Sequence, residues 1–219
     1  MLIMNTPQFD TQDDDGNGNG ISPISEWHMK QQPWMTTFSF CDLEFHSSVL
    51  NIFIRLRNTF RSAKDTPLSP IKVHDLTCFV LHRLLTAPNT TEPAGSPVSE
   101  CIRYGIILYM LTVQGPIYYT HMPMLCGFVG QLRLQLTYSV ISSLPRPLNL
   151  WLVAVGLVAS LGTPYHSTFQ GDARHLSASM CISTWQDLSK QIRKVLWLDM
   201  SCIESLFQDQ WNIALEQSY

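Results

Sequence analysis

Acidic, imidazole and basic side chains stand close together at two places in the chain, with spacings that suit proton transfer or metal binding. Asp172 and His175 are three residues apart, with His166 nearby, and side chains at that spacing share one face of a helix. Glu100 and Arg103 have the same spacing at the start of an apolar segment. Hydrogen bonds and ion pairs that orient a helix explain both pairs equally well. A small helical enzyme or ligand-binding protein that uses Asp172, His175 and Glu100 therefore stays open as one hypothesis.

The six cysteines lack the spacing of a structural zinc site. They stand at positions 41, 78, 101, 126, 181 and 202, whereas such a site needs close pairs such as C-x2-C. Four of them, at 78, 101, 126 and 202, lie in apolar helical patterns, where cysteine behaves as a small buried hydrophobe. Neither a Gly-rich phosphate loop nor a G-x-S-x-G turn is present. We expect free thiols, no metal, no cofactor and no catalytic residue.

The charge distribution argues against a DNA-binding surface. The net charge is −3, and residues 1–30 account for more than all of it with Asp10, Asp13, Asp14, Asp15 and Glu26 against Lys30. The remainder of the chain is close to neutral, whereas nucleic-acid-binding proteins show a basic patch. Lys190, Arg193 and Lys194 form one small basic face, which we interpret as solvated rather than as a phosphate-binding track.

Residues 1–40 are predicted to be a disordered acidic tail. Positions 13–20 hold only aspartate, glycine and asparagine, and a segment without apolar residues cannot offset its ordering entropy by burial. Bulky apolar residues follow: Trp27, Met29, Trp34, Met35 and Phe38. Acidic and bulky apolar residues together are typical of a transcriptional activation segment. A solvated tail with a few docking residues is the alternative.

Hydrophobic periodicity over residues 41–219 predicts an all-α domain. Apolar residues recur at helical spacing in five stretches: Leu43–Phe60, Val73–Leu85, Val98–Val113, the residues after Pro123, and Leu148–Leu161. Ser96 and Pro97 suit the N-cap and first position of the third stretch. Ser183-x-x-Gln186 and Ser201-x-x-Glu204 have the capping-box pattern and predict two further helices near the C-terminus.

The segment from Tyr104 to Gly171 decides between a membrane protein and a protein core. It contains 68 residues with only two formal charges, Arg133 and Arg146. A bilayer-spanning helix needs about 20 mostly apolar residues, and prolines at 116, 123, 145, 147 and 164 divide this segment into shorter pieces. We therefore expect burial by protein; a membrane-associated protein that uses Val98–Val113 and Leu148–Leu161 remains the alternative.

Three motifs in the C-terminal two-thirds resemble the fungal-specific transcription factor domain. The first is the acidic-Cys-x-Arg opening at Ser99–Gly105, with Glu100, Cys101 and Arg103. The second is the Leu-Trp-apolar-Gly-apolar-Ala block at Asn149–Ser160, with Trp151 and Gly156. The third is the closing Leu-Trp-apolar-Asp segment with Trp197 and Asp199, followed by Trp211. The resemblance covers roughly residues 70–217.

The resemblance implies an all-α regulatory domain of the kind found in nuclear Zn2Cys6 transcription factors, which often control metabolic gene clusters. In that family an N-terminal binuclear zinc cluster with paired cysteines reads the DNA, whereas residues 1–40 of this chain contain no cysteine. No metal ligand or base-reading residue is carried over. The resemblance thus implies a truncated, nuclear regulator of transcription that works through protein partners, a full-length transcription factor or self-association, without direct DNA binding. The signature residues themselves are expected to set helix packing, with Gly156 permitting a close approach.

Overall fold

The computed structural model describes residues 2–3, 6–7, 21–28, 46–86, 96–115, 122–138 and 144–216. Within these ranges the all-α prediction is confirmed, because the chain forms eight α-helices and only two short paired strands. The helices are α1 (Ser47–Ser62), α2 (Pro70–Thr86), α3 (Pro97–Gln114), α4 (Met122–Tyr138), α5 (Arg146–Ala159), α6 (His166–Met180), α7 (Trp185–Ile192) and α8 (Ser201–Glu216). The strands are β1 (Leu2–Ile3) and β2 (Thr6–Pro7), and a 3-10 helix, η1 (Ser25–His28), precedes α1.

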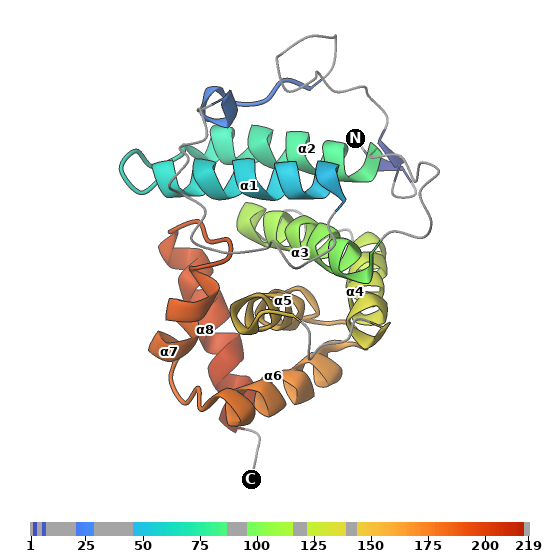
Figure 1. Ribbon diagram of the computed structural model, residues 1–219, viewed down its shortest axis with the longest axis vertical. Coiled ribbons are helices and arrows are strands. Elements are labelled where there is room, and N and C mark those ends of the chain that lie inside the picture. The colour runs from blue at the N-terminus through green and yellow to red at the C-terminus, as the bar shows by residue number, and fades with distance from the viewer. Residues whose placement is uncertain are drawn as a thin grey trace.

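Helices α3 and α5 form the centre of the molecule. Figure 1 shows α5 nearly end-on, with α3 above it, α6 below it, and α4, α7 and α8 around it. Helix α3 in turn contacts α1 and α2 on its other side. The buried apolar side chains from Ile24 to Ala214 form one continuous hydrophobic core. The two most apolar helices are therefore the ones that the other helices enclose.

The two apolar helices of the sparsely charged segment Tyr104–Gly171, which we call the neutral segment, are buried by protein. Every residue of α5 from Leu148 to Ala159 is buried, as is every residue of α3 from Gly105 to Val113. A helix that is apolar on all sides belongs in a core or a membrane. Among the residues that the structure describes, none of the helices has the length and hydropathy that a bilayer crossing requires.

One part of the predicted tail is docked on the helical domain. The Trp27 side chain is only 1% exposed and its ring packs edge-on against Phe79 of α2, with 5.2 Å between centroids. Beside it, Glu26 forms an ion pair with Lys72, which lowers the pKa of the Glu26 carboxyl. Residues 21–28 thus fit the docking interpretation and not disorder. The acidic run and the residues Met29, Trp34, Met35 and Phe38 lie outside the described residues.

The two capping-box predictions are wrong in detail. Helix α7 is capped by Thr184, whose Oγ1 accepts a hydrogen bond from the Asp187 N–H at 3.2 Å, one residue after the predicted Ser183. Helix α8 begins at Ser201, and Glu204 makes its contacts with Arg193 and Trp185 instead of closing a box. Ser96 stands at the N-cap of α3 as predicted, but its side chain makes no capping hydrogen bond.

Helix α6 was not predicted from the sequence. Its buried face consists of Phe169, Gln170, Ala173, Leu176 and Ser177, so polar and small residues make up much of a face that usually carries large apolar ones. Phe169 packs against Gly156 of α5: a Cβ atom at Gly156 would lie 2.1 Å from the Phe169 ring. Gly156 therefore permits a close approach between helices, as expected, and the helix that approaches it is α6.

We expect Gly156→Ala to destabilise the fold by about 1–3 kcal/mol, because a buried aromatic ring must move to admit the methyl group. Gly171→Ala is the matched control, since Gly171 is also helical and a Cβ atom there would meet nothing within 4 Å. Removing a mid-helix glycine at an open position should stabilise the protein by about 0.5–1 kcal/mol. Urea unfolding of both variants measures the two effects; equal effects would contradict this packing.

We expect Trp27→Ala to lower the free energy of unfolding by about 3 kcal/mol, because the substitution removes a fully buried aromatic side chain. Ile71→Ala serves as the control, since Ile71 is 73% exposed and its loss should change the stability by less than about 0.5 kcal/mol. Urea unfolding followed by circular dichroism gives both values. A Trp27→Ala variant as stable as the parent would show that η1 is not part of the folded domain.

Candidate functional site

The segment between α7 and α8, residues 193–200, is held by the two central helices, and we call it the α7–α8 linker. The indole Nε1–H of Trp151, on α5, donates to the Leu196 carbonyl at 2.8 Å. The Leu198 N–H donates to the hydroxyl oxygen of Tyr109, on α3, also at 2.8 Å. Both bonds are buried, so they fix the path of the linker backbone.

An aromatic cluster surrounds Tyr109. Its ring centroid lies 5.8 Å from that of Trp151, 6.0 Å from that of Trp197 and 6.2 Å from that of Phe207. Trp197 also packs edge-on against Phe207 at 5.1 Å and lies 6.3 Å from Trp185. Such aromatic pairs add about 0.5–1.5 kcal/mol each beyond the area that they bury. The cluster therefore joins α3, α5, α7, α8 and the linker.

The Tyr109 phenol cannot act as an acid–base group near neutral pH. Burial raises its pKa well above the ordinary value, and the hydrogen bond from Leu198 opposes that rise only partly. The hydroxyl thus stays protonated and serves as an acceptor for the linker backbone.

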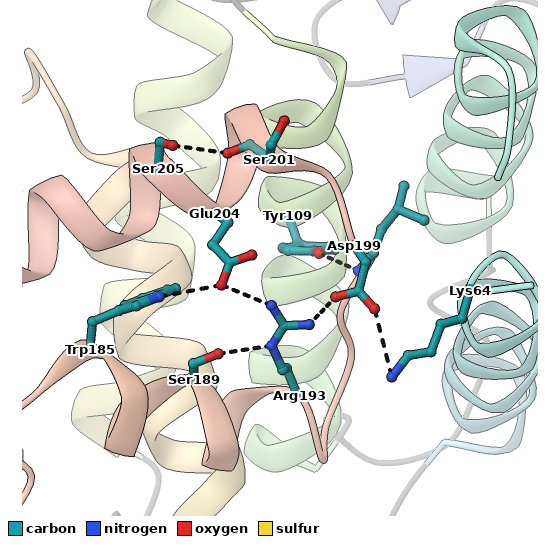
Figure 2. Close-up of polar contacts among 10 residues, drawn as sticks. Lys64, Tyr109, Trp185, Ser189, Arg193, Asp199, Ser201, Glu204 and Ser205 are labelled. Atoms are coloured by element: carbon teal, nitrogen blue, oxygen red, sulfur yellow. Dashed lines mark hydrogen bonds and ion pairs between the residues drawn. The ribbon is translucent and has the colours of Figure 1, made fainter.

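A polar network lies beside the aromatic cluster, and Figure 2 shows its members: Lys64, Trp185, Ser189, Arg193, Asp199 and Glu204. Arg193 is its centre, because its guanidinium pairs with the carboxylates of both Asp199 and Glu204. The Arg193–Glu204 contact is 2.9 Å, and Arg193 Nε donates to the Ser189 hydroxyl at 2.8 Å. Lys64 reaches Asp199 from the far side at 3.6 Å.

The predicted basic face, which lies at the end of α7 and the start of the linker, is therefore only partly solvated. Lys190 and Lys194 are exposed, whereas Arg193 is a member of the network and lies over the Trp197 ring, 5.6 Å from its centroid. Two of the signature residues, Trp197 and Asp199, thus contact the same arginine.

The residues proposed for an enzyme have separate partners. Glu100 pairs with Arg103 within α3 at 2.8 Å, while Asp172 of α6 pairs with Arg133 of α4. His175 is exposed. In the ranges that the structure describes, no group of histidine, cysteine and carboxylate side chains is arranged to hold a metal ion.

Asp172 and His166 have structural surroundings. Burial raises the pKa of the Asp172 carboxyl, and the Arg133 guanidinium opposes this rise. His166 Nδ1 lies 3.2 Å from the Ser160 hydroxyl, near the turn between α5 and α6. Arg133 is one of the two charges in the neutral segment, so its pairing with Asp172 explains how that charge is accommodated beside the core.

Sequence analysis missed one pairing of reactive groups, on α2. The Cys78 sulfur lies 3.6 Å from His74 Nε2, and His74 Nδ1 lies 3.3 Å from the side-chain oxygen of Gln114 on α3. The i, i+4 spacing of His74 and Cys78 was the available signal. A nucleophilic cysteine needs a lowered pKa, but burial and the charge of Asp75 raise that of Cys78. The arrangement therefore does not activate the thiol.

The other cysteines differ in accessibility. The five in the described ranges are free. Of the four cysteines predicted to be buried, Cys101 is buried, Cys78 and Cys126 are half-buried, and Cys202 is exposed. Cys181, for which burial was not predicted, is also exposed. Cys202 is the second residue of α8 and stands outside the face on which Ile203 and Phe207 are buried.

Comparison of the chain with protein-family models, with curated proteins and with solved structures gave no match.

We expect iodoacetamide at pH 7.5 to modify Cys181 and Cys202 first, because both thiols are exposed. Cys78 should react more slowly, since its raised pKa keeps the thiolate fraction low, and its rate should still rise between pH 8 and 9. Cys101 should react only after unfolding. Peptide mass spectrometry over time resolves each site. Modification of Cys78 ahead of Cys181 would show an activated thiol instead.

Proposed function

We propose that this protein is a regulator of transcription whose helical domain resembles that of fungal Zn2Cys6 factors and acts through protein partners. In this proposal the chain works in the nucleus and influences the expression of metabolic genes, with secondary-metabolite clusters as the first candidates. The partner is a full-length transcription factor or a second copy of the chain. Direct DNA binding is not part of the proposal, because no paired cysteines or basic stretch correspond to the DNA reader of that family.

The observation that supports this proposal most is that the second and third motifs are in contact with each other and with the helix that the first motif opens. The second block provides Trp151, whose indole N–H bonds the backbone just before Trp197 of the third block. Tyr109, on the helix that the first block opens, packs against both rings at 5.8 and 6.0 Å.

The remaining signature residues also have packing roles. Arg103 pairs with Glu100, donates to the Leu84 carbonyl at 3.3 Å and so ties the start of α3 to the end of α2. Cys101 is fully buried on α3, and Trp211 is 1% exposed on α8. In this proposal these residues build the helical scaffold that presents a surface to protein partners.

Fusion of the full chain to a heterologous DNA-binding domain tests the proposal in a fungal reporter strain. We expect a reproducible change in reporter output, in either direction. We also expect the chain without the heterologous DNA-binding domain to accumulate in nuclei. Unchanged reporter output together with exclusion of the chain from nuclei would contradict the proposal.

Two glycine variants separate a specific effect from mere expression of the fusion. Gly156→Ala disturbs the packing of α5 on α6 and should reduce the effect on the reporter, whereas Gly171→Ala should retain it. Immunoblotting must show equal amounts of both fusions. Equal reporter output from the parent and from the less stable Gly156→Ala variant would mean that this helix packing does not carry the effect.

A further inference from the structure

The turn between α1 and α2, residues 63–69, leads into the only pair of prolines in the chain that stand three residues apart. These are Pro67 and Pro70, and Pro70 is also the first residue of α2. Together with Lys64 they give the pattern Lys-x-x-Pro-x-x-Pro over residues 64–70, which we call the proline segment. In Figure 1 this turn projects beyond the ends of both helices. The P-x-x-P pattern is typical of ligands for domains that bind a polyproline II helix.

The prolines restrict the backbone of the segment. Each proline fixes its own φ at about −65° and biases the residue before it toward extended or polyproline II geometry. Residues 67–69 belong to neither a helix nor a strand. Ser69 fixes the end of the segment, because its hydroxyl accepts a hydrogen bond from the Lys72 N–H at 3.3 Å. A ligand that is already restricted loses less conformational entropy on binding.

The side chains that a groove for P-x-x-P receives are the ones that the segment exposes. A polyproline II helix has about three residues per turn, so residues three apart share an edge. In that geometry Pro67 and Pro70 lie on one edge, and Thr66 and Ser69 lie on the neighbouring one. These four residues are exposed, whereas Leu68, on the third edge, is half-buried and packs against the core. Leu68 therefore anchors the segment, and the two edges that contain the prolines face the solvent.

The exposed apolar surface continues onto the first turn of α2. Ile71 directly follows Pro70 and is 73% exposed, more than any other large apolar side chain among the described residues. Exposed apolar residues that adjoin one another indicate a contact site more than scattered ones do. Two prolines and an isoleucine thus present apolar surface at one end of the α1–α2 pair.

Lys64 supplies a positive charge at the other end of the segment. Its side chain is 55% exposed and lies 3.6 Å from the Asp199 carboxylate, which also pairs with Arg193. An exposed ion pair of this kind contributes little to stability, so Lys64 can exchange Asp199 for a carboxylate on another protein. Charge complementarity therefore favours a partner with acidic residues beside its proline-binding groove.

We propose that the proline segment is a docking site for an SH3-type domain, which has an aromatic-lined groove for a polyproline II helix and an acidic pocket beside it. Pro67 and Pro70 enter the groove, Lys64 pairs with the acidic pocket, and Ile71 lies at the edge of the contact. The helical domain stays folded on binding, because these residues are exposed beforehand. The inference does not depend on the proposed regulatory function.

An array of purified SH3 domains, probed with the labelled full chain, tests the site. WW domains are included because they bind other proline-rich ligands. Isothermal titration calorimetry then measures the affinity of each domain that retains the chain, and we expect saturable 1:1 binding to at least one SH3 domain. Binding to none of the SH3 domains, or to WW domains alone, would overturn the proposal.

Variants of the full chain locate the contact. Pro67→Ala and Pro70→Ala should each weaken binding at least about tenfold, because each removes a ring from the groove. Lys64→Gln should weaken it as well, whereas Lys64→Arg keeps the charge and should retain it. Pro164→Ala is the matched control, since Pro164 is also exposed, also follows a threonine and also precedes a helix, α6, but lies outside the segment. Equal binding by both proline variants and this control would overturn the proposal.

A synthetic peptide of residues 62–72 separates the loss of a contact from the loss of the fold. The peptide should compete with the full chain for the SH3 domain, and the same peptide with both Pro67→Ala and Pro70→Ala should not. Circular dichroism must show that every full-chain variant keeps the helix content of the parent. A parent peptide that does not compete would place the binding elsewhere on the chain and contradict the proposal.

Discussion

Two buried hydrogen bonds hold the α7–α8 linker against the apolar core, and the arrangement of the C-terminal half depends on them. Tyr109 accepts from the Leu198 N–H, and Trp151 donates to the Leu196 carbonyl. Each aromatic side chain thus satisfies its only polar atom on the linker, which in turn needs buried partners for its own backbone. An unsatisfied buried amide would cost about 1–3 kcal/mol. The position of Trp197 and the network around Arg193 both follow from this path of the backbone.

The sequence was sufficient to predict those helices that contain a long run or stripe of apolar residues. The α3 and α5 helices were predicted because few positions in them are polar. The predicted apolar stripe of α4 is also buried as expected, at Leu125, Phe128, Val129, Leu132 and Leu136. Helix α6 was missed because much of its buried face is small or polar. That face fits α5 only through the contact of Phe169 with Gly156, and such a fit becomes visible only when both helices are placed.

The polar contacts were harder to predict because their partners are far apart in the chain. Arg133 meets Asp172, and Arg57 meets the Lys194 carbonyl, yet nothing local in the sequence pairs these residues. Glu204 has the spacing of a capping box with Ser201, but a nearby guanidinium offered a stronger partner than a backbone amide. Asp172 and His175 were therefore proposed as a chemical pair from their spacing alone, whereas in the structure Asp172 pairs with Arg133 and His175 is exposed.

Hydrogen exchange at the Leu198 amide tests most directly whether the core holds the linker. The account predicts that this amide exchanges in the native protein as slowly as the amides of α3 and α5, although it lies outside any helix. Tyr109→Phe should accelerate its exchange selectively, because the substitution removes the acceptor and keeps the ring. Fast exchange of the Leu198 amide in the parent protein, at the rate of an exposed loop, would contradict the account.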